Sequence, residues 1–165
     1  MRDPSTVPYR TFHYSAHQQQ SFREGSLMCA WASAYPDIFD QDDFRLAAAQ
    51  RDYHFFEWLA AILLFHTEGY LSLVEQYEFK CHKRKQEKLR HILASSPVLD
   101  LVLRRNKGAQ CPDLFVYKPD GSDWFFAEVK GPGDRLGDAE RALFSSLRDC
   151  TGSAVRIITF KPIGG

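Results

Sequence analysis

The chain has 165 residues, of which 44% are hydrophobic and 25% charged, and its 21 acidic and 21 basic side chains give a net charge of zero. These values are typical of one globular domain and exclude collagen-like and wholly disordered chains. The longest apolar run, 58–65, has eight residues, whereas about 20 are needed to cross a bilayer, and the N-terminus lacks a signal-peptide core. We therefore expect an intracellular protein without a membrane partner.

The first 50 residues contain three prolines and no sustained hydrophobic period. We expect an N-terminal arm with one or two short helices, followed by the main domain over 51–165. One arm helix is expected within 37–49, where Asp40 or Asp42 can cap its first turn. The four cysteines are scattered without C-x-x-C spacing, which predicts free thiols and no zinc module.

The predicted elements of the main domain change from helices to strands along the chain. Residues 52–66 have apolar side chains at helical spacing before Gly69, which predicts a buried helix, and a second helix is predicted over 80–93. Residues 97–104 fit either a helix end or a strand. Strand-like runs at 114–117 and 124–129 flank a linker with hairpin composition. A helix from about 135 or 138 to 149 and a strand over 155–160 complete the order.

Charge is distributed unevenly along the chain. Residues 80–107 carry nine basic side chains against two acidic ones, whereas the segments on either side are acidic or balanced. A cationic segment binds polyanions through its local potential, even in a neutral protein. The alternative interpretation is a solvated helix face rich in lysine.

The hairpin brings charged residues together. A turn centred between residues 120 and 121 places Asp113 opposite Glu128, and Lys130 then lies on the same sheet face as Glu128. Neighbouring carboxylates repel each other, and a hard divalent cation such as Mg²⁺ or Mn²⁺ would offset that repulsion. The alternative is an ion triplet in which Lys130 neutralises one carboxylate and the other is solvated or protonated.

The string CPDLFV at 111–116, followed by AEVKGPGDRL at 127–136, resembles the VRR-NUC branch of the PD-(D/E)XK nuclease superfamily. The resemblance covers a motif core at 108–160. It implies an α/β fold, with a restriction-endonuclease-like mixed sheet flanked by helices and preceded by a helical N-terminal region. It also implies a Mg²⁺- or Mn²⁺-dependent nuclease that hydrolyses DNA phosphodiesters and prefers branched or otherwise structured DNA. Small stand-alone members of the branch tend to be homodimers.

The resemblance assigns roles to residues of the hairpin. Asp113, Glu128 and the main-chain carbonyl of Val129 would be metal ligands, and Lys130 would be the catalytic lysine. The family also places a glutamate on a helix that precedes the core, and Glu57 is the best match in this chain.

Alternatives exist for this glutamate. An acid in the first turn of a helix is also favourable to the helix dipole, which would explain Glu57 without a metal. Glu75 and Glu78 are the substitutes for Glu57 in the family pattern.

The chain departs from the family pattern at Glu140, where a glutamine is usual. A glutamine side chain can donate a hydrogen bond to phosphate, whereas a carboxylate only accepts. Glu140 would therefore modify the site, either as a further metal ligand or by repelling phosphate.

In a nuclease, the basic segment becomes a track for the DNA backbone. The predicted DNA contacts are Lys83, Arg84, Lys85, Lys88, Arg104, Arg105, Lys107 and Arg135. The alternative function is a catalytically weak or inactive nucleic-acid-binding module of the same fold. A structural protein with an acidic N-terminal surface and an RNase with the same site are further alternatives.

Overall fold

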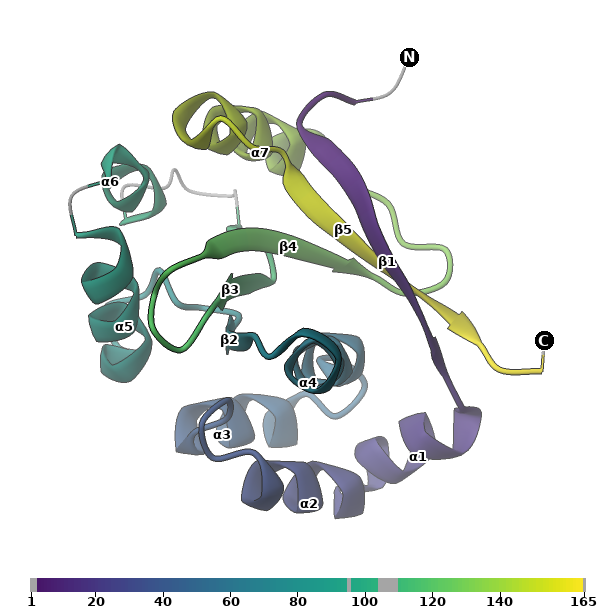
Figure 1. Ribbon diagram of the computed structural model, residues 1–165. Coiled ribbons are helices and arrows are strands. Elements are labelled where there is room, and N and C mark those ends of the chain that lie inside the picture. The colour runs from purple at the N-terminus through teal and green to yellow at the C-terminus, as the bar shows by residue number, and fades with distance from the viewer. Residues whose placement is uncertain (1–2, 95, 104–109, 165) are drawn as a thin grey trace.

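The computed structural model describes residues 3–94, 96–103 and 110–164, which contain a five-stranded mixed sheet of order β1-β5-β4-β3-β2 (Figure 1). The strands are β1 (Thr6–Tyr14), β2 (Leu71–Val74), β3 (Leu114–Tyr117), β4 (Trp124–Lys130) and β5 (Val155–Pro162). β5 runs parallel to both β1 and β4, whereas β3 is antiparallel to β2 and β4. This architecture confirms the predicted α/β class and is consistent with a restriction-endonuclease-like fold.

Helices cover both faces of the sheet (Figure 1). In the described residues they are α1 (Ala16–Glu24), α2 (Ser26–Ala34), α3 (Gln41–Ala49), α4 (Phe55–Glu68), α5 (Lys83–Leu93), α6 (Pro97–Leu103) and α7 (Asp138–Thr151). One core lies between the sheet and α1–α4, and a second lies between the opposite face and α5–α7. No helix of the described part of the chain is long and apolar enough to span a membrane.

The alternation of side chains along β3 explains why two cores form. Leu114 and Val116 belong to the α1–α4 core, while Phe115 and Tyr117 point to the α5–α7 core. All four are buried because successive residues of a strand face opposite sides and both sides are covered. The continuous apolar run of β3 is therefore a requirement of a central strand.

The N-terminal 50 residues contribute more than the expected arm with one or two short helices. β1 is an edge strand of the sheet, and α1, α2 and α3 follow it. β1 escaped prediction because its side chains are mostly exposed, without a hydrophobic alternation, and because it contains Pro8, which strands tolerate mainly at edges. β2 has four residues and was not predicted either.

Several local predictions are confirmed. Asp40 is the N-cap of α3, where its side chain accepts a hydrogen bond from the Asp43 amide, and Gly69 ends α4 in a left-handed conformation. Segment 97–104, which fitted a helix end or a strand, forms α6 over Pro97–Leu103. In the hairpin, Leu114 pairs with Ala127, which is the predicted register.

Candidate metal centre

The first component of the site is the beginning of α4. The helix is apolar around most of its circumference and packs in the α1–α4 core, but its first turn carries Glu57. Burial raises the pKa of Glu57 well above its ordinary value, and the nearby carboxylates of Asp113 and Glu75 raise it further. Glu57 therefore lies in an environment that disfavours its charged form unless a cation is present.

The second component is the hairpin. Asp113 directly precedes β3, and its Oδ2 accepts a hydrogen bond of 2.8 Å from the backbone amide of Val129. The carboxyl groups of Asp113 and Glu128 lie close enough to influence each other's pKa. Burial raises the pKa of both residues, and for Glu128 the charge of Asp113 adds to the rise. The predicted juxtaposition of Asp113 and Glu128 is therefore present.

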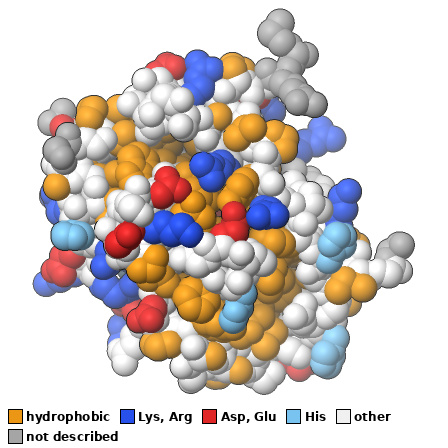
Figure 2. Space-filling model, viewed as in Figure 1, with side chains coloured by type: hydrophobic (Ala, Val, Ile, Leu, Met, Phe, Trp, Pro, Cys, Tyr) orange, Lys and Arg blue, Asp and Glu red, His pale blue; other side chains and the backbone are white. Residues whose placement is uncertain are grey.

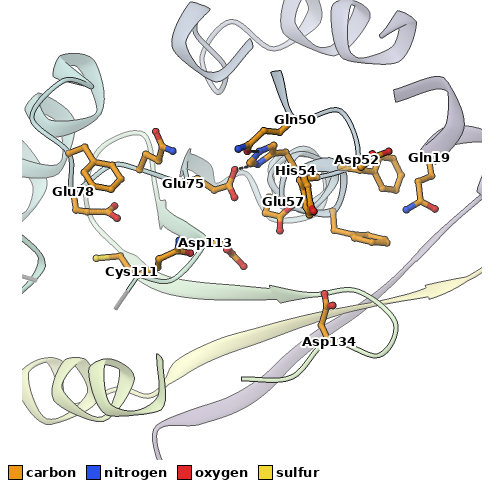
Figure 3. A pocket seen from close by; sticks show the side chains of 16 residues that line it. Gln19, Gln50, Asp52, His54, Glu57, Glu75, Glu78, Cys111, Asp113 and Asp134 are labelled. Atoms are coloured by element: carbon orange, nitrogen blue, oxygen red, sulfur yellow. Dashed lines mark hydrogen bonds and ion pairs between the residues drawn. The ribbon is translucent and has the colours of Figure 1, made fainter. Parts of the chain in front are cut away.

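The third component is the end of β2. One side-chain oxygen from each of Glu57, Glu75 and Asp113 lies within 4.8 Å of the other two. Figure 3 shows these side chains converging from α4, from the end of β2 and from the start of β3. Glu75, considered in the sequence only as a substitute for Glu57, thus lies beside it. Glu128 is not one of these three residues and adjoins them through Asp113.

The carboxylates of Glu57, Glu75 and Asp113 line a cavity of about 810 Å³. Its other acidic lining residues are Asp52, Glu78 and Asp134 (Figure 3). No lysine or arginine of the described residues lines this cavity, and His54 is its one basic side chain there. The cavity is therefore strongly electronegative, and its carboxylate oxygens are the ligands that Mg²⁺ and Mn²⁺ prefer. The residues present fit a divalent cation.

Lys130 lies at the end of β4, beside the acidic group. Its Nζ is 3.7 Å from an oxygen of Glu128 and 3.7 Å from an oxygen of Glu140, which is in the first turn of α7. Burial acts to lower the pKa of Lys130, but the surrounding carboxylates outweigh it and the pKa is raised. Glu140, the departure from the family pattern, thus contacts the lysine predicted to be catalytic.

His54 is a further residue of this cavity and directly precedes α4. Its Nδ1 is 2.5 Å from an oxygen of Glu75, and its Nε2 is 2.7 Å from Oε1 of Gln50. His54 has a φ of 75°, a left-handed conformation that is uncommon outside glycine. Nothing in the sequence indicated this contact, because 21 residues separate His54 from Glu75 and the approach depends on the folded chain.

The predicted DNA contacts differ in their accessibility. Lys83 and Arg135 are exposed. Arg84 is half-buried and its Nε donates to Asp40 at 2.6 Å, and Lys88 lies over the ring of Tyr117. Arg104, Arg105 and Lys107 lie outside the described residues. On the face shown in Figure 2, basic and acidic side chains are interspersed, so this face presents no continuous basic track.

The prediction that Lys85 contacts DNA is wrong. Its side chain is 1% exposed, and its ammonium lies 2.5 Å from Asp43 of α3. Lys85 is on the face of α5 that packs toward α3 and the end of β2, where a buried charge must be paired. A count of charges along the sequence cannot distinguish this lysine from its solvated neighbours.

The fold and the acidic cavity place the chain among α/β domains of the restriction-endonuclease type. Comparison with protein-family models matches residues 59–160 to the VRR-NUC domain. The match covers more than half of the chain, and the chain therefore belongs to the VRR-NUC family of nucleases. Among curated proteins, no relative matches the chain.

Proposed function

We propose that this protein is a DNA nuclease that hydrolyses phosphodiester bonds with Mg²⁺ or Mn²⁺ as cofactor. The observation that carries the proposal is the convergence of Glu57, Glu75 and Asp113, whose side-chain oxygens lie within 4.8 Å of one another in an acidic cavity. Membership of a nuclease family supports the same conclusion. The metal ligands in this proposal are Asp113, Glu128, the main-chain carbonyl of Val129 and Glu57, to which the geometry adds Glu75.

The electrostatics of the cavity favour cation binding. Without a cation, burial and mutual repulsion raise the pKa values of Glu57 and Glu128, so these groups tend to hold protons. A divalent cation would replace those protons and stabilise the ionised carboxylates. When bound, the cation would act as a Lewis acid toward the phosphate and lower the pKa of the attacking water.

Lys130 is proposed to orient the attacking water and the scissile phosphate. Its ammonium is held between Glu128 and Glu140, at the rim of the acidic group. This position allows a positive charge to approach the phosphate, which the carboxylates alone would repel. Lys83, Lys88 and Arg135, together with the basic residues of 104–107, are proposed to contact the DNA backbone. A preference for branched DNA and a homodimeric assembly belong to the same proposal and rest on the resemblance.

A catalytically weak DNA-binding module is the second candidate function. It is favoured by Glu140, whose carboxylate lies 3.7 Å from Lys130. A glutamate here competes with phosphate for the lysine and adds a negative charge that repels DNA. This candidate predicts DNA binding without cleavage.

Cleavage of labelled duplex, single-stranded, flap and four-way-junction DNA tests the proposal. The reactions contain Mn²⁺, Mg²⁺ or EDTA and compare the wild type with Lys130→Ala. The matched control is Lys161→Ala, which removes an exposed lysine of β5. The proposal predicts metal-dependent cleavage that falls at least about hundredfold in Lys130→Ala and is unchanged in the control. Binding without cleavage in either metal would leave the DNA-binding module.

A further inference from the structure

The buried side chain of Lys85 has three acceptors. Its Nζ donates to Oδ1 of Asp43 at 2.5 Å, to the carbonyl of Val74 at 2.5 Å and to the carbonyl of Glu75 at 2.9 Å. An ammonium has three protons, so these acceptors satisfy it completely. The side chain therefore links α5 and α3 to the last residue of β2 and to Glu75.

The segment that Lys85 holds has an unusual conformation. Glu75 and Gln76 have φ values of 53° and 52°, in the left-handed region that residues with a Cβ adopt at a cost. Such a conformation persists where surrounding contacts determine it. The carbonyl of Glu75 accepts the hydrogen bond from Lys85, and the backbone amide of Glu75 donates to the carbonyl of Asp113 at 2.7 Å. The backbone of Glu75 is thus fixed on both sides.

The same turn directs the Glu75 carboxylate into the acidic group. One carboxylate oxygen of Glu75 lies within 4.8 Å of oxygens of Glu57 and Asp113. Oε2 of Glu75 also lies 2.5 Å from Nδ1 of His54. Figure 3 shows Glu75 between His54 and Asp113. A change of the backbone at this turn would move the carboxylate relative to the other two acids.

We propose that Lys85 is a positioning residue of the metal centre, acting through the left-handed turn at Glu75. Its ammonium holds the Val74 and Glu75 carbonyls and thereby keeps the Glu75 carboxylate directed at Glu57 and Asp113. Asp43 neutralises the buried charge. This inference rests on the proposed cation site and assigns to it a residue that never touches the cation.

Two variants separate positioning from stability. Asp43→Asn removes the ion pair but leaves Lys85 bonded to both carbonyls, whereas Lys85→Met/Asp43→Asn also removes those bonds without leaving an unpaired buried charge. Mn²⁺ affinity is measured by calorimetry and cleavage by kcat and KM, each beside the melting temperature. Arg148→Ala, which breaks a surface pair with Asp149, is the control.

The expected result is near wild-type Mn²⁺ affinity in Asp43→Asn and a loss of about tenfold to hundredfold in the double variant. In a Glu75→Gln background, Lys85→Met should cost no further affinity, because its effect passes through Glu75. A purely structural lysine predicts affinity that follows melting temperature in every variant, which would overturn the inference. Wild-type affinity in the double variant would also overturn it.

A single variant keeps the test valid should the double variant not fold. Lys85→Gln retains one donor group, so its Mn²⁺ affinity should lie between those of the wild type and the double variant. An affinity equal to that of the wild type would overturn the inference. Failure of the proposed function would be seen in the wild type itself, which would then neither bind Mn²⁺ nor cleave DNA. The inference about Lys85 would then be wrong as well.

Discussion

Single acidic residues decide the behaviour of this site. Glu57 is half-buried beside two other carboxylates, and its raised pKa indicates that the fold accommodates its charge poorly without a cation. A group whose pKa is raised on folding contributes stability below its unfolded pKa, and this contribution is lost as pH rises through the folded pKa. Metal-free protein should therefore lose stability as pH rises above the ordinary pKa of glutamate.

Glu57 is expected to lower the stability of the metal-free protein but to hold the cation, and Glu57→Gln tests both effects. Glutamine is neutral without taking up a proton, so it avoids the cost of either charging or protonating Glu57, and we expect the metal-free variant to gain about 1–2 kcal/mol in free energy of unfolding at neutral pH. It should also lose most of the stabilisation that Mn²⁺ gives the wild type. Urea denaturation with and without Mn²⁺ measures both effects, with exposed Glu87→Gln as the control. A destabilised metal-free variant would contradict this explanation.

Glu140→Gln tests the contact with Lys130. The Glu140 carboxylate contributes to raising the pKa of Lys130, so its neutralisation should lower that pKa. Because Lys130 acts as an ammonium, the fall of kcat at high pH should then move to lower pH. Loss of the carboxylate that competes with phosphate should increase the rate at neutral pH by about twofold to tenfold. A kcat–pH profile on one DNA substrate measures the change. A profile that is unchanged, or shifted to higher pH, would show that Glu140 does not act on the lysine.

Among single residues, the sequence predicted those site residues that a short turn brings together. Asp113 and Glu128 could be paired because a hairpin register depends on a short turn. Glu75 was considered only as a substitute for Glu57, and His54 was not assigned to the site, because their contacts depend on left-handed backbone and on packing between distant segments. The burial of Lys85 depends on α3, which lies far from it in sequence.

At the scale of elements, the loop after β4 must fit against the beginning of α4. A Cβ at Gly131 would lie 2.7 Å from Cε2 and 2.9 Å from Cδ2 of Phe56, and the Gly131 amide donates to Asp134 at 2.9 Å. Phe56 immediately precedes Glu57. Close approach of this loop therefore couples the hairpin to the helix that supplies the acid.

Gly131→Ala should displace Phe56 and with it the first turn of α4. We expect a loss of about 1–3 kcal/mol in free energy of unfolding and weaker Mn²⁺ binding. Gly133→Ala is the matched control, since a Cβ there has open space and only its φ of 82° opposes the substitution. It should cost about 1 kcal/mol and leave Mn²⁺ affinity unchanged. Equal affinities for both variants would contradict the proposed coupling.

Elements with a strong period or clear end signals were predictable, and elements defined by pairing were not. α4 and α7 have apolar spacing and glycine stops, and the predicted boundaries lie within a few residues of those observed. β1 and β2 are edge strands, one exposed and the other short. Their existence depends on hydrogen bonds to β5 and β3, which a local sequence pattern does not encode.

At the scale of the whole molecule, the N-terminal segment is part of the core. Phe22 of α1 is fully buried, and its ring packs against those of Trp31, Phe55 and Trp58. Phe55 begins α4, one turn or less from Glu57. The first 50 residues thus support the helix that carries the acid, although the family match begins at residue 59.

Phe22→Ala should therefore destabilise the entire domain. Loss of a fully buried aromatic ring costs about 3–5 kcal/mol, which should appear as a lower urea midpoint in one cooperative transition. Ile163→Ala, at a side chain that is 65% exposed, should change stability by less than about 0.5 kcal/mol. Two separate transitions in the wild type would show that the N-terminal segment folds independently.

The central claim is that Glu57, Glu75 and Asp113 hold a divalent cation. Anomalous diffraction from crystals grown with Mn²⁺ tests it most directly, because the signal locates the metal itself. The account predicts a peak between these three carboxylates that disappears in Asp113→Asn and persists in the exposed control Asp120→Asn. No peak at this position, in crystals of protein that cleaves DNA with Mn²⁺, would contradict it.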